Sequence, residues 1–367
     1  MVLFLILAVL ILFGAHYLIW FSAVRFFVLS KLAKNILAVG LGFLMVSFVL
    51  SSLLAHYWQG NIFARFLYGV SGFWLGWLVN SLLASAAAWL VIWLARLFNI
   101  KVNRATLGAG LFGISLVIAV YGVWNAFHPI INNISVKISD LPATWQGKKI
   151  IMISDVHLGH IYRADFMDKM AEKINAQQPE MILIDGDLFD GIDGDSLDEL
   201  VEPLNKLTAP QGVYFVTGNH ETYLGLSRAE HVLNQTKIKI LDDEIELING
   251  LQLIGVSYPA GNAFNKDVAR AIQEAGYNID LPSILMYHQP TNIADAKKLG
   301  IDLQLAGHTH NGQIWPIKFF VQMIFKGYEY GLHVEENYSE YTSAGLGTWG
   351  PPLRTGNRPE IVVIELK

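Results

Sequence analysis

The complete absence of acidic residues before Asp140 constrains this 367-residue chain more than any other feature. The first 139 residues contain eight Lys and Arg residues, whereas the other 18 basic residues stand against all 31 acidic residues. The chain therefore divides near residue 140 into a part of charge +8 and a part of charge −13. The acidic second part argues against a nucleic-acid partner, which would require a basic face.

Four consecutive stretches of the first part lack Lys, Arg, Asp and Glu, and each exceeds the roughly 20 residues that a helix needs to cross a bilayer. They predict a transmembrane domain over 1–136 with spans at about 1–24, 35–58, 67–95 and 105–128. The first stretch lacks the basic start and the small-residue cleavage site of a secretion signal, so we expect it to be retained.

The basic residues between the spans predict the orientation of the chain. Three lie in 25–34 and three in 96–104, whereas Arg65 stands alone and only Lys137 follows the fourth span. Cytoplasmic connections carry the excess of Lys and Arg. We therefore expect the region after residue 140 on the outer side of the cytoplasmic (inner) membrane. A different number of crossings in the long third stretch would reverse this orientation.

The spans also contain tryptophans near helical spacing and a few polar residues: Trp74, Trp77, Trp89, Trp93, His16, His56, Asn80 and Ser81. The tryptophans fit a cofactor or substrate groove or, as we favour, an aromatic belt and packing. The polar residues mark a functional path or, as we favour, hydrogen bonds between helices, because no charged partner lies nearby.

In the second part, short β-prone runs such as KIIMIS, EMILID and GVYFVTG alternate with helical patterns such as RADFMDKMAEKINA. This alternation predicts an α/β domain over 137–367 with a mostly buried sheet. Its chemistry should lie on the loops that follow the strands. The sequence has no cysteine, so any transition-metal site must use His, Asp, Glu, Asn or backbone ligands.

Polar residues follow five of the apolar runs. They stand in SDVHLGH, GDLFD, GNHE, LMYHQP and GHTHNGQ, as Asp155, His157, Asp187, Asp190, Asn219, His220, His288, His308 and His310. Carboxylate oxygens and imidazole nitrogens at the ends of rigid strands suit a hard or borderline divalent cation. Five such loops in order predict a metal site.

The order and spacing of these segments resemble the calcineurin-like metallophosphoesterase family, whose signature is D-x-H, G-D-x-x-D, G-N-H-[ED], a lone His and G-H-x-H. The resemblance covers about residues 148–367 and implies a layered αββα sandwich. It also implies two divalent metal ions (Mn, Fe or Zn). Asp155, His157 and His310 would hold one ion, Asn219, His288 and His308 the other, and Asp187 would bridge them.

The resemblance implies further roles outside the metal ligands. His220 would protonate or hydrogen-bond the leaving oxygen, and Asp190 would orient His220, with a capping or turn carboxylate as the alternative for Asp190. Arg354 is a candidate for gripping phosphate, or equally a structural Arg paired with acidic residues. Gly191 stands where the Ser/Thr phosphatase branch has Arg, and the tail from Tyr341 resembles the bacterial membrane-associated branch.

The segment 314–331, IWPIKFFVQMIFKGYEYG, is unusually apolar for a stretch that follows a metal loop. It predicts a surface that lies against the membrane or lines an entry for an acyl chain. A buried helix is the alternative.

The combined prediction is a membrane-anchored phosphoesterase that hydrolyses a phosphodiester or pyrophosphate bond of an envelope lipid or polymer by attack of a metal-activated hydroxide. One alternative is a cytoplasm-facing pyrophosphohydrolase of the kind that cleaves UDP-diacylglucosamine. Another is a receptor that binds phosphate ligands without catalysis, and a third makes the helices a transporter gated by the hydrolase. The expected partners are a phosphate-ester substrate and the bilayer, with no nucleic acid and an oligomeric state that the sequence leaves open.

Overall fold

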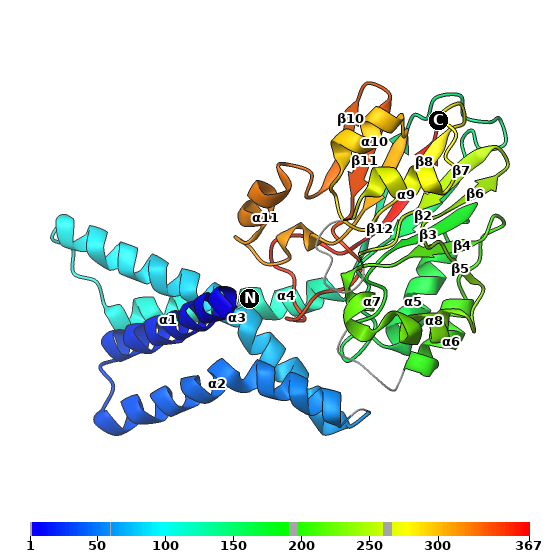
Figure 1. Cartoon of the computed structure of the whole chain (residues 1–367). Coiled ribbons are helices and arrows are strands. Elements are labelled where there is room, and N and C mark those ends of the chain that lie inside the picture. Colours follow the sequence, from blue (N-terminus) through cyan, green and yellow to red (C-terminus); the bar gives the residue numbers. More distant parts are fainter. Residues whose placement is uncertain (1, 59, 191–196, 260–265) are drawn as a thin grey trace. The chain divides into compact units, whose positions relative to one another are not determined.

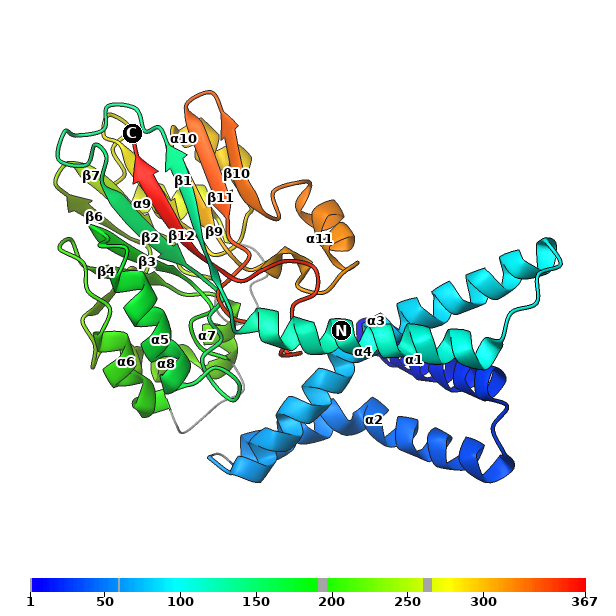
Figure 2. The same cartoon turned by 180° about the vertical axis from the view of Figure 1, so that it is seen from behind.

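The computed structural model describes residues 2–58, 60–190, 197–259 and 266–367 (Figures 1 and 2). The chain forms two compact units. One comprises Met1–Trp124 and Gly350–Thr355, and the other comprises Asn125–Trp349 and Gly356–Lys367. We call them the helical unit and the sheet unit.

The helical unit contains helices that are long and apolar enough to cross a membrane: α1 (Val2–Phe27), α2 (Lys31–Tyr57), α3 (Ile62–Leu97) and α4 (Arg104–Ala126). They coincide with the four uncharged stretches, so the prediction of four apolar helices is confirmed. The long third stretch forms one continuous helix of 36 residues. Large apolar side chains such as Val39 and Ile62 stay exposed on these helices, as expected of surfaces that face lipid.

Polar side chains cap the starts of three of these helices. Ser30 Oγ accepts from the amide of Ala33 at 3.3 Å. Asn61 Oδ1 accepts from the amides of Phe63 and Ala64, and Asn103 Oδ1 does the same for the start of α4. The first amides of a helix have no partner within it, so these side chains fix where α2, α3 and α4 begin.

A short segment from near the end of the chain also belongs to the helical unit. Leu353 packs against Gly76 of α3, and a Cβ added at Gly76 would overlap its side chain. Thr355 packs against Gly122 of α4, where an added Cβ would also come too close to its side chain. Because glycine has no side chain, these two positions let residues 350–355 pack directly against the backbone of the helices.

The sheet unit contains two six-stranded mixed sheets. The first has the order β1 (Ile130–Val136), β12 (Glu360–Leu366), β2 (Lys149–Ile153), β3 (Met181–Asp185), β4 (Val213–Val216) and β5 (Ile238–Ile240). The second has the order β10 (Gly331–Glu335), β11 (Tyr338–Thr342), β9 (Leu303–Ala306), β8 (Ser283–Met286), β7 (Leu251–Gly255) and β6 (Glu244–Ile248). Strands β2, β3, β4 and β5 run parallel in the first sheet, as do β7, β8, β9 and β11 in the second.

The two sheets pack face to face through alternate residues of their strands. Met152 of β2 and Leu183 of β3 share one core with Leu253 of β7 and Met286 of β8. The other faces of the strands are covered by helices, because Ile151 and Ile153 pack with the apolar face of α5 (Ala164–Asn175). The prediction of an αββα sandwich is therefore confirmed.

The remaining helices lie in the connections. Figures 1 and 2 show α5, α6 and α8 beside the first sheet and α9 and α10 beside the second. Their bounds are η1 (Leu197–Leu200), α6 (Val201–Asn205), α7 (Asn219–Leu224), α8 (Leu226–Leu233), α9 (Val268–Glu274), α10 (Ile293–Leu299), η2 (His310–Gly312) and α11 (Lys318–Phe325).

Candidate metal centre

The predicted site residues lie at one edge of the sandwich, where the parallel strands of both sheets end. Asp155 and His157 follow β2, Asp187 follows β3 and Asn219 follows β4. From the second sheet, His288 follows β8, and His308 and His310 follow β9. Because parallel strands present their carboxyl ends at the same edge, loops far apart in the sequence meet here.

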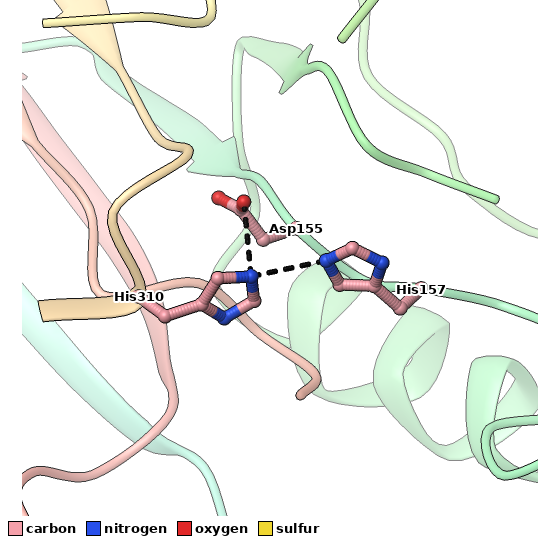
Figure 3. A group of neighbouring side chains, drawn as sticks. All are labelled: Asp155, His157 and His310. Carbon is pink, nitrogen blue, oxygen red and sulfur yellow. Dashed lines mark hydrogen bonds and ion pairs between the residues drawn. The ribbon is translucent and has the colours of Figure 1, made fainter. Parts of the chain in front are cut away.

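Asp155, His157 and His310 form one group of side chains that point toward one another (Figure 3). His310 Nε2 lies 3.0 Å from His157 Nε2 and 3.4 Å from Asp155 Oδ1. All three side chains are buried. Two imidazole nitrogens and a carboxylate oxygen thus converge on a single point.

A second group surrounds Asp187. His288 Nε2 lies 3.1 Å from Asp187 Oδ2, and Asp187, His288 and His308 offer ligand atoms within 4.8 Å of one another. Asn219 Oδ1 lies 2.8 Å from His308 Nδ1, which brings the amide into the same group. Asp187 Oδ2 is also 4.0 Å from His157 Nε2, so its carboxylate borders both groups.

The motifs need their glycines because the loops approach one another closely. A Cβ at Gly186 would overlap the ring of His288, and one at Gly218 would overlap the carboxylate of Asp187. A Cβ at Gly307 would overlap Asp155. The glycine before each of Asp187, Asn219 and His308 therefore leaves room for a ligand side chain from another loop.

The backbone at the site is strained. Left-handed φ values between 48° and 70° occur at five of the seven predicted ligands, namely Asp155, His157, Asp187, His308 and His310. Each costs free energy in a residue with a side chain, of the order of 1–3 kcal/mol. Such strain persists where the surrounding structure fixes it, and it aims side chains that a regular strand would point elsewhere.

His220 stands beside the two groups and carries its own carboxylate partner. Its ring packs edge-on against His157 with ring centroids 4.5 Å apart. Its Nδ1 lies 3.5 Å from Asp190 Oδ1, the position from which Asp190 is predicted to orient the ring. Burial alone would lower the pKa of His220, but Asp190 and Asp187 raise it above the usual value. The ring can thus hold a proton near neutral pH.

Burial and neighbouring charges shift the pKa values of the site residues in different directions. Burial lowers the pKa of His157 to about 3 and that of His308 to about 4, so both rings are neutral and present lone pairs. Burial raises the pKa of Asp155 to about 6. Burial would also raise the pKa of Asp187, but the adjacent His288 holds it well below its usual range.

The side chains present fit a bound cation. His288 Nδ1 donates to the carbonyl of Asp185 at 2.7 Å, and its buried Nε2 faces the carboxylate of Asp187 at 3.1 Å. Burial would lower the pKa of His288, but Asp187 and Asp155 raise it well above the usual value, so a bound cation would take the place of a proton on Nε2. The hydrogen bond from Nδ1 orients the ring for that role, as in imidazoles that bind metals. Imidazoles, an amide oxygen and carboxylates form a donor set that suits Mn, Fe and Zn alike.

Two of the residues considered in the sequence are not part of the groups described above. Arg354 belongs to the helical unit, where it is fully buried and its amide donates to the carbonyl of Gly122 at 2.9 Å. Its role in binding phosphate stays a prediction. Gly191, which distinguishes the chain from the Ser/Thr phosphatase branch, lies outside the described residues.

Glu221 is a positioning residue whose role the motif alone did not reveal. Its fully buried carboxylate accepts from the amides of Asp187 and Phe189, both at 3.0 Å, and of Gly218 at 2.7 Å. It therefore ties the loop after β3 to the loop after β4. The only signal in the sequence was its place in GNHE, which says nothing of three backbone donors.

Two exposed aromatic residues at the site also escaped sequence reasoning. Tyr223 and Trp349 both lie near His220, with ring centroids 5.3 Å and 6.5 Å from it. Gln313 fixes Trp349 by accepting from its amide at 3.0 Å and donating to its carbonyl at 3.2 Å. An aromatic residue in a tail loop carries no pattern that would assign it to a metal edge.

A two-layer sheet sandwich whose strand ends gather histidines and carboxylates is the arrangement expected of a metal-dependent enzyme. The family model for calcineurin-like phosphoesterase matches residues 148–312. An uncharacterized metallophosphoesterase of Campylobacter jejuni is 33% identical over 70% of this chain and 70% of its own length. The chain belongs to the calcineurin-like phosphoesterase family, and it is a metal-dependent phosphoester hydrolase.

The chain spans less than two thirds of the length of some other relatives. An uncharacterized metallophosphoesterase of Helicobacter pylori is 35% identical over 59% of each chain. A transmembrane protein with metallophosphoesterase domain from Bos taurus is 30% identical over 69% of this chain and 61% of its own length. A dimetal phosphatase from Danio rerio matches in structure with a TM-score of 0.37 and 12% identity, over 55% of this chain and 88% of that one.

Proposed function

We propose that the chain is a membrane-anchored phosphoesterase with two divalent metal ions, which hydrolyses a phosphodiester or pyrophosphate bond of an envelope lipid or polymer. The observation that carries the proposal is the position of Asp187 between two groups of ligand atoms. Its Oδ2 faces His157 Nε2 at 4.0 Å and His288 Nε2 at 3.1 Å. A carboxylate in that position is suited to bridge two cations.

The residues of the chain divide the work of hydrolysis. Two bound cations would supply the charge that clamps a phosphate and lowers the pKa of a water between them. Asp155, His157 and His310 would hold one cation, and Asn219, His288 and His308 the other. His220 is placed to give a proton to the leaving oxygen, because Asp190 and Asp187 favour its protonated form. Asp190 would hold the ring of His220 in its orientation.

The lipid part of the proposal depends on the helical unit. Four apolar helices in the same chain support membrane association, and the basic residues between them favour a sheet unit on the outer side of an inner membrane. A phosphoesterase held at that surface meets the phosphates of lipid and of lipid-linked polymer at high local concentration. Reporter fusions at residue 140 test the orientation, and a cytoplasmic signal would favour the nucleotide-linked lipid alternative.

Turnover of a soluble ester tests the reaction separately from the lipid. The full chain, purified in detergent and loaded with Mn²⁺, should hydrolyse bis-p-nitrophenyl phosphate and bind two metal ions per chain. The His310→Ala variant is expected to bind fewer ions, since it removes one of the three ligands shown in Figure 3. A folded, metal-loaded protein that turns over no ester would overturn the proposal and favour the receptor alternative.

A further inference from the structure

The helix α11 and the turn before it expose a group of large apolar side chains. Trp315, Phe319, Phe320, Met323 and Ile324 are between 46% and 71% exposed. The four helical members stand at positions i, i+1, i+4 and i+5, which places them on one face of a helix. We call these five residues the α11 patch. Contiguous apolar surface of this kind marks an interaction site.

The structure excludes the buried-helix alternative for this segment. None of the eight residues of α11, all of which are described, is buried. Both views of the chain place α11 beside the two sheets rather than on either of their faces (Figures 1 and 2). The patch therefore adds little to the core of the sheet unit, and its apolar surface calls for a partner.

The charged residues that flank the patch along the chain are basic, in a half of the chain that is otherwise acidic. Lys318 begins α11 and Lys326 follows its last residue, whereas residues 311–328 contain no Asp or Glu. The ammonium of Lys318 lies over the ring of Phe319 at 5.4 Å from its centroid. Lysines at the edges of an apolar face can reach anionic headgroups while their stems stay on the apolar surface.

The inner side of α11 is fixed to the metal loop. The ring of Phe325 lies edge-on to that of His308 with centroids 6.0 Å apart. Thr309 Oγ1 donates to the carbonyl of Glu329 at 2.7 Å, which ties the segment after α11 to the same loop. A surface that held the α11 patch would therefore lie next to the candidate metal centre.

We infer that the α11 patch docks on the headgroup region of an anionic lipid bilayer. Three features point to this partner: the exposed apolar face, the lysines at both its ends, and Trp315, whose ring suits a membrane interface. The four apolar helices of the same chain keep a bilayer within reach at all times. This docking concerns a surface outside the ligand set, so it goes beyond the proposed function and gives that site access to lipid phosphates.

A fluorescent probe in the patch tests the docking directly. The chain has no cysteine, so Met323→Cys introduces a single thiol for an environment-sensitive dye. The full chain is placed in nanodiscs that contain phosphatidylglycerol, with nitroxide groups on part of the acyl chains. Leu247→Cys is the matched control, because Leu247 is an apolar residue of β6 that is 60% exposed, against 71% for Met323.

We expect the nitroxide lipids to quench the dye at position 323 at least about twofold more than the dye at position 247, because only the former would reach the interface. Equal quenching at the two positions would overturn the inference. A blue-shifted dye at position 323 that lipid does not quench would also overturn it, because the patch would then be covered by protein, such as a second copy of the chain.

Two further variants separate the docking from the reaction. The Lys318→Gln/Lys326→Gln double variant should lose part of the quenching at position 323, and unchanged quenching would refute the anionic preference. The Met323→Ser/Ile324→Ser variant should hydrolyse bis-p-nitrophenyl phosphate as the unmodified chain does, since the patch lies outside the site. If no form of the chain turned over this ester, the proposed function would fail while the quenching result would still decide the docking.

Discussion

Histidine has opposite surroundings in the two units of this chain. In the helical unit, His16 Nε2 accepts from the indole Nε1 of Trp74 at 3.1 Å, and its Nδ1 lies 2.8 Å from the carbonyl of Leu12. In the sheet unit, His157 and His310 turn their Nε2 atoms toward each other at 3.0 Å. Both ring nitrogens of His16 have neutral partners. The close approach of His157 and His310 is instead explained by a cation bound between their rings.

The same contrast extends to the other polar groups. Three of the four tryptophans of α3 donate to Ser115, Ser22 and His16, which supports packing rather than a cofactor groove. The sheet unit instead buries carboxylates such as Asp155 and Asp187 beside imidazoles. A buried polar group that has a neutral hydrogen-bond partner is typical of packing within a fold. A buried cluster of ligand atoms that lack such partners indicates a binding site.

The largest expected effect comes from the residue shared by both ligand groups. Asp187→Asn should lower turnover of bis-p-nitrophenyl phosphate by about 10³-fold or more and reduce the number of bound metal ions, because a neutral amide bridges cations poorly. Turnover and metal analysis measure the two effects. Asp198→Asn, which changes an exposed carboxylate, is the control. A variant that kept both ions and most of its activity would refute the bridging role.

His220 should matter for turnover but not for metal binding. His220→Gln is expected to lower turnover by about 10²–10⁴-fold while the metal content stays the same, as expected for loss of a general acid. Asp190→Asn should have a smaller effect and should shift the pH profile of turnover, because Asp190 helps to raise the pKa of His220. Loss of a metal ion in the His220 variant would make this residue a ligand instead.

The sheet unit should lose stability as pH rises through the titration of Glu340, whereas the spans of the helical unit contain no acid to titrate. Burial raises the pKa of Glu340 to about 8, so the folded state holds a proton that the unfolded state has lost. This stabilisation is complete below the unfolded pKa and is lost as pH rises toward 8.

Between about pH 5 and 8, the free energy of unfolding should therefore fall relative to that of Glu340→Gln, by at most about 1.4 kcal/mol per pH unit. Chemical unfolding of both proteins across this range measures the difference. Parallel pH dependence of the two proteins would show that Glu340 does not titrate as expected.

Glu221→Gln should destabilise the loops of the site. The amide group keeps one acceptor oxygen for the three backbone donors that the carboxylate now satisfies. We expect a loss of about 1–3 kcal/mol in the free energy of unfolding. Hydrogen exchange of the backbone amides of Asp187, Phe189 and Gly218 locates the effect. Unchanged protection of all three amides would contradict the role of Glu221 in tying the two loops together.

The smallest effect is expected in the helical unit. Trp74→Phe removes the hydrogen bond to His16, which is worth about 0.6 kcal/mol between helices in a membrane. Unfolding in detergent measures this loss, with Trp93→Phe as the control because Trp93 is 56% exposed. Metal content and turnover should stay the same in both variants, and a large loss of activity would mean that the helices do more than anchor the chain.

Much of the fold could be predicted because its signals are local. The uncharged stretches predict α1 to α4 from length and composition alone, and each of the runs KIIMI, MILID and VYFV is a buried parallel strand. The placement of Gly350–Thr355 in the helical unit could not be predicted. It depends on close approach to Gly76 and Gly122, which lie more than 200 residues earlier in the chain.

The candidate site divides in the same way. The ligand types and their order are legible because each follows a strand, and the glycine before Asp187, Asn219 or His308 is part of the motif. The role of Glu221 in tying two loops together could not be predicted, because its three backbone partners belong to both of these loops. The exposure of α11 was undecided in the sequence as well, since an apolar helix can face a core or a membrane.

The sequence by itself determined the elements of this protein and the chemistry available to them. Hydrophobic length, charge and motif spacing act over a few residues and need no long-range contact. The tertiary structure decided which side chains share a point in space, with Asp187 between two groups of imidazoles and Trp349 beside His220. The physical reason is that two sheets, brought together by burial of their apolar faces, aligned the ends of strands that lie up to about 150 residues apart.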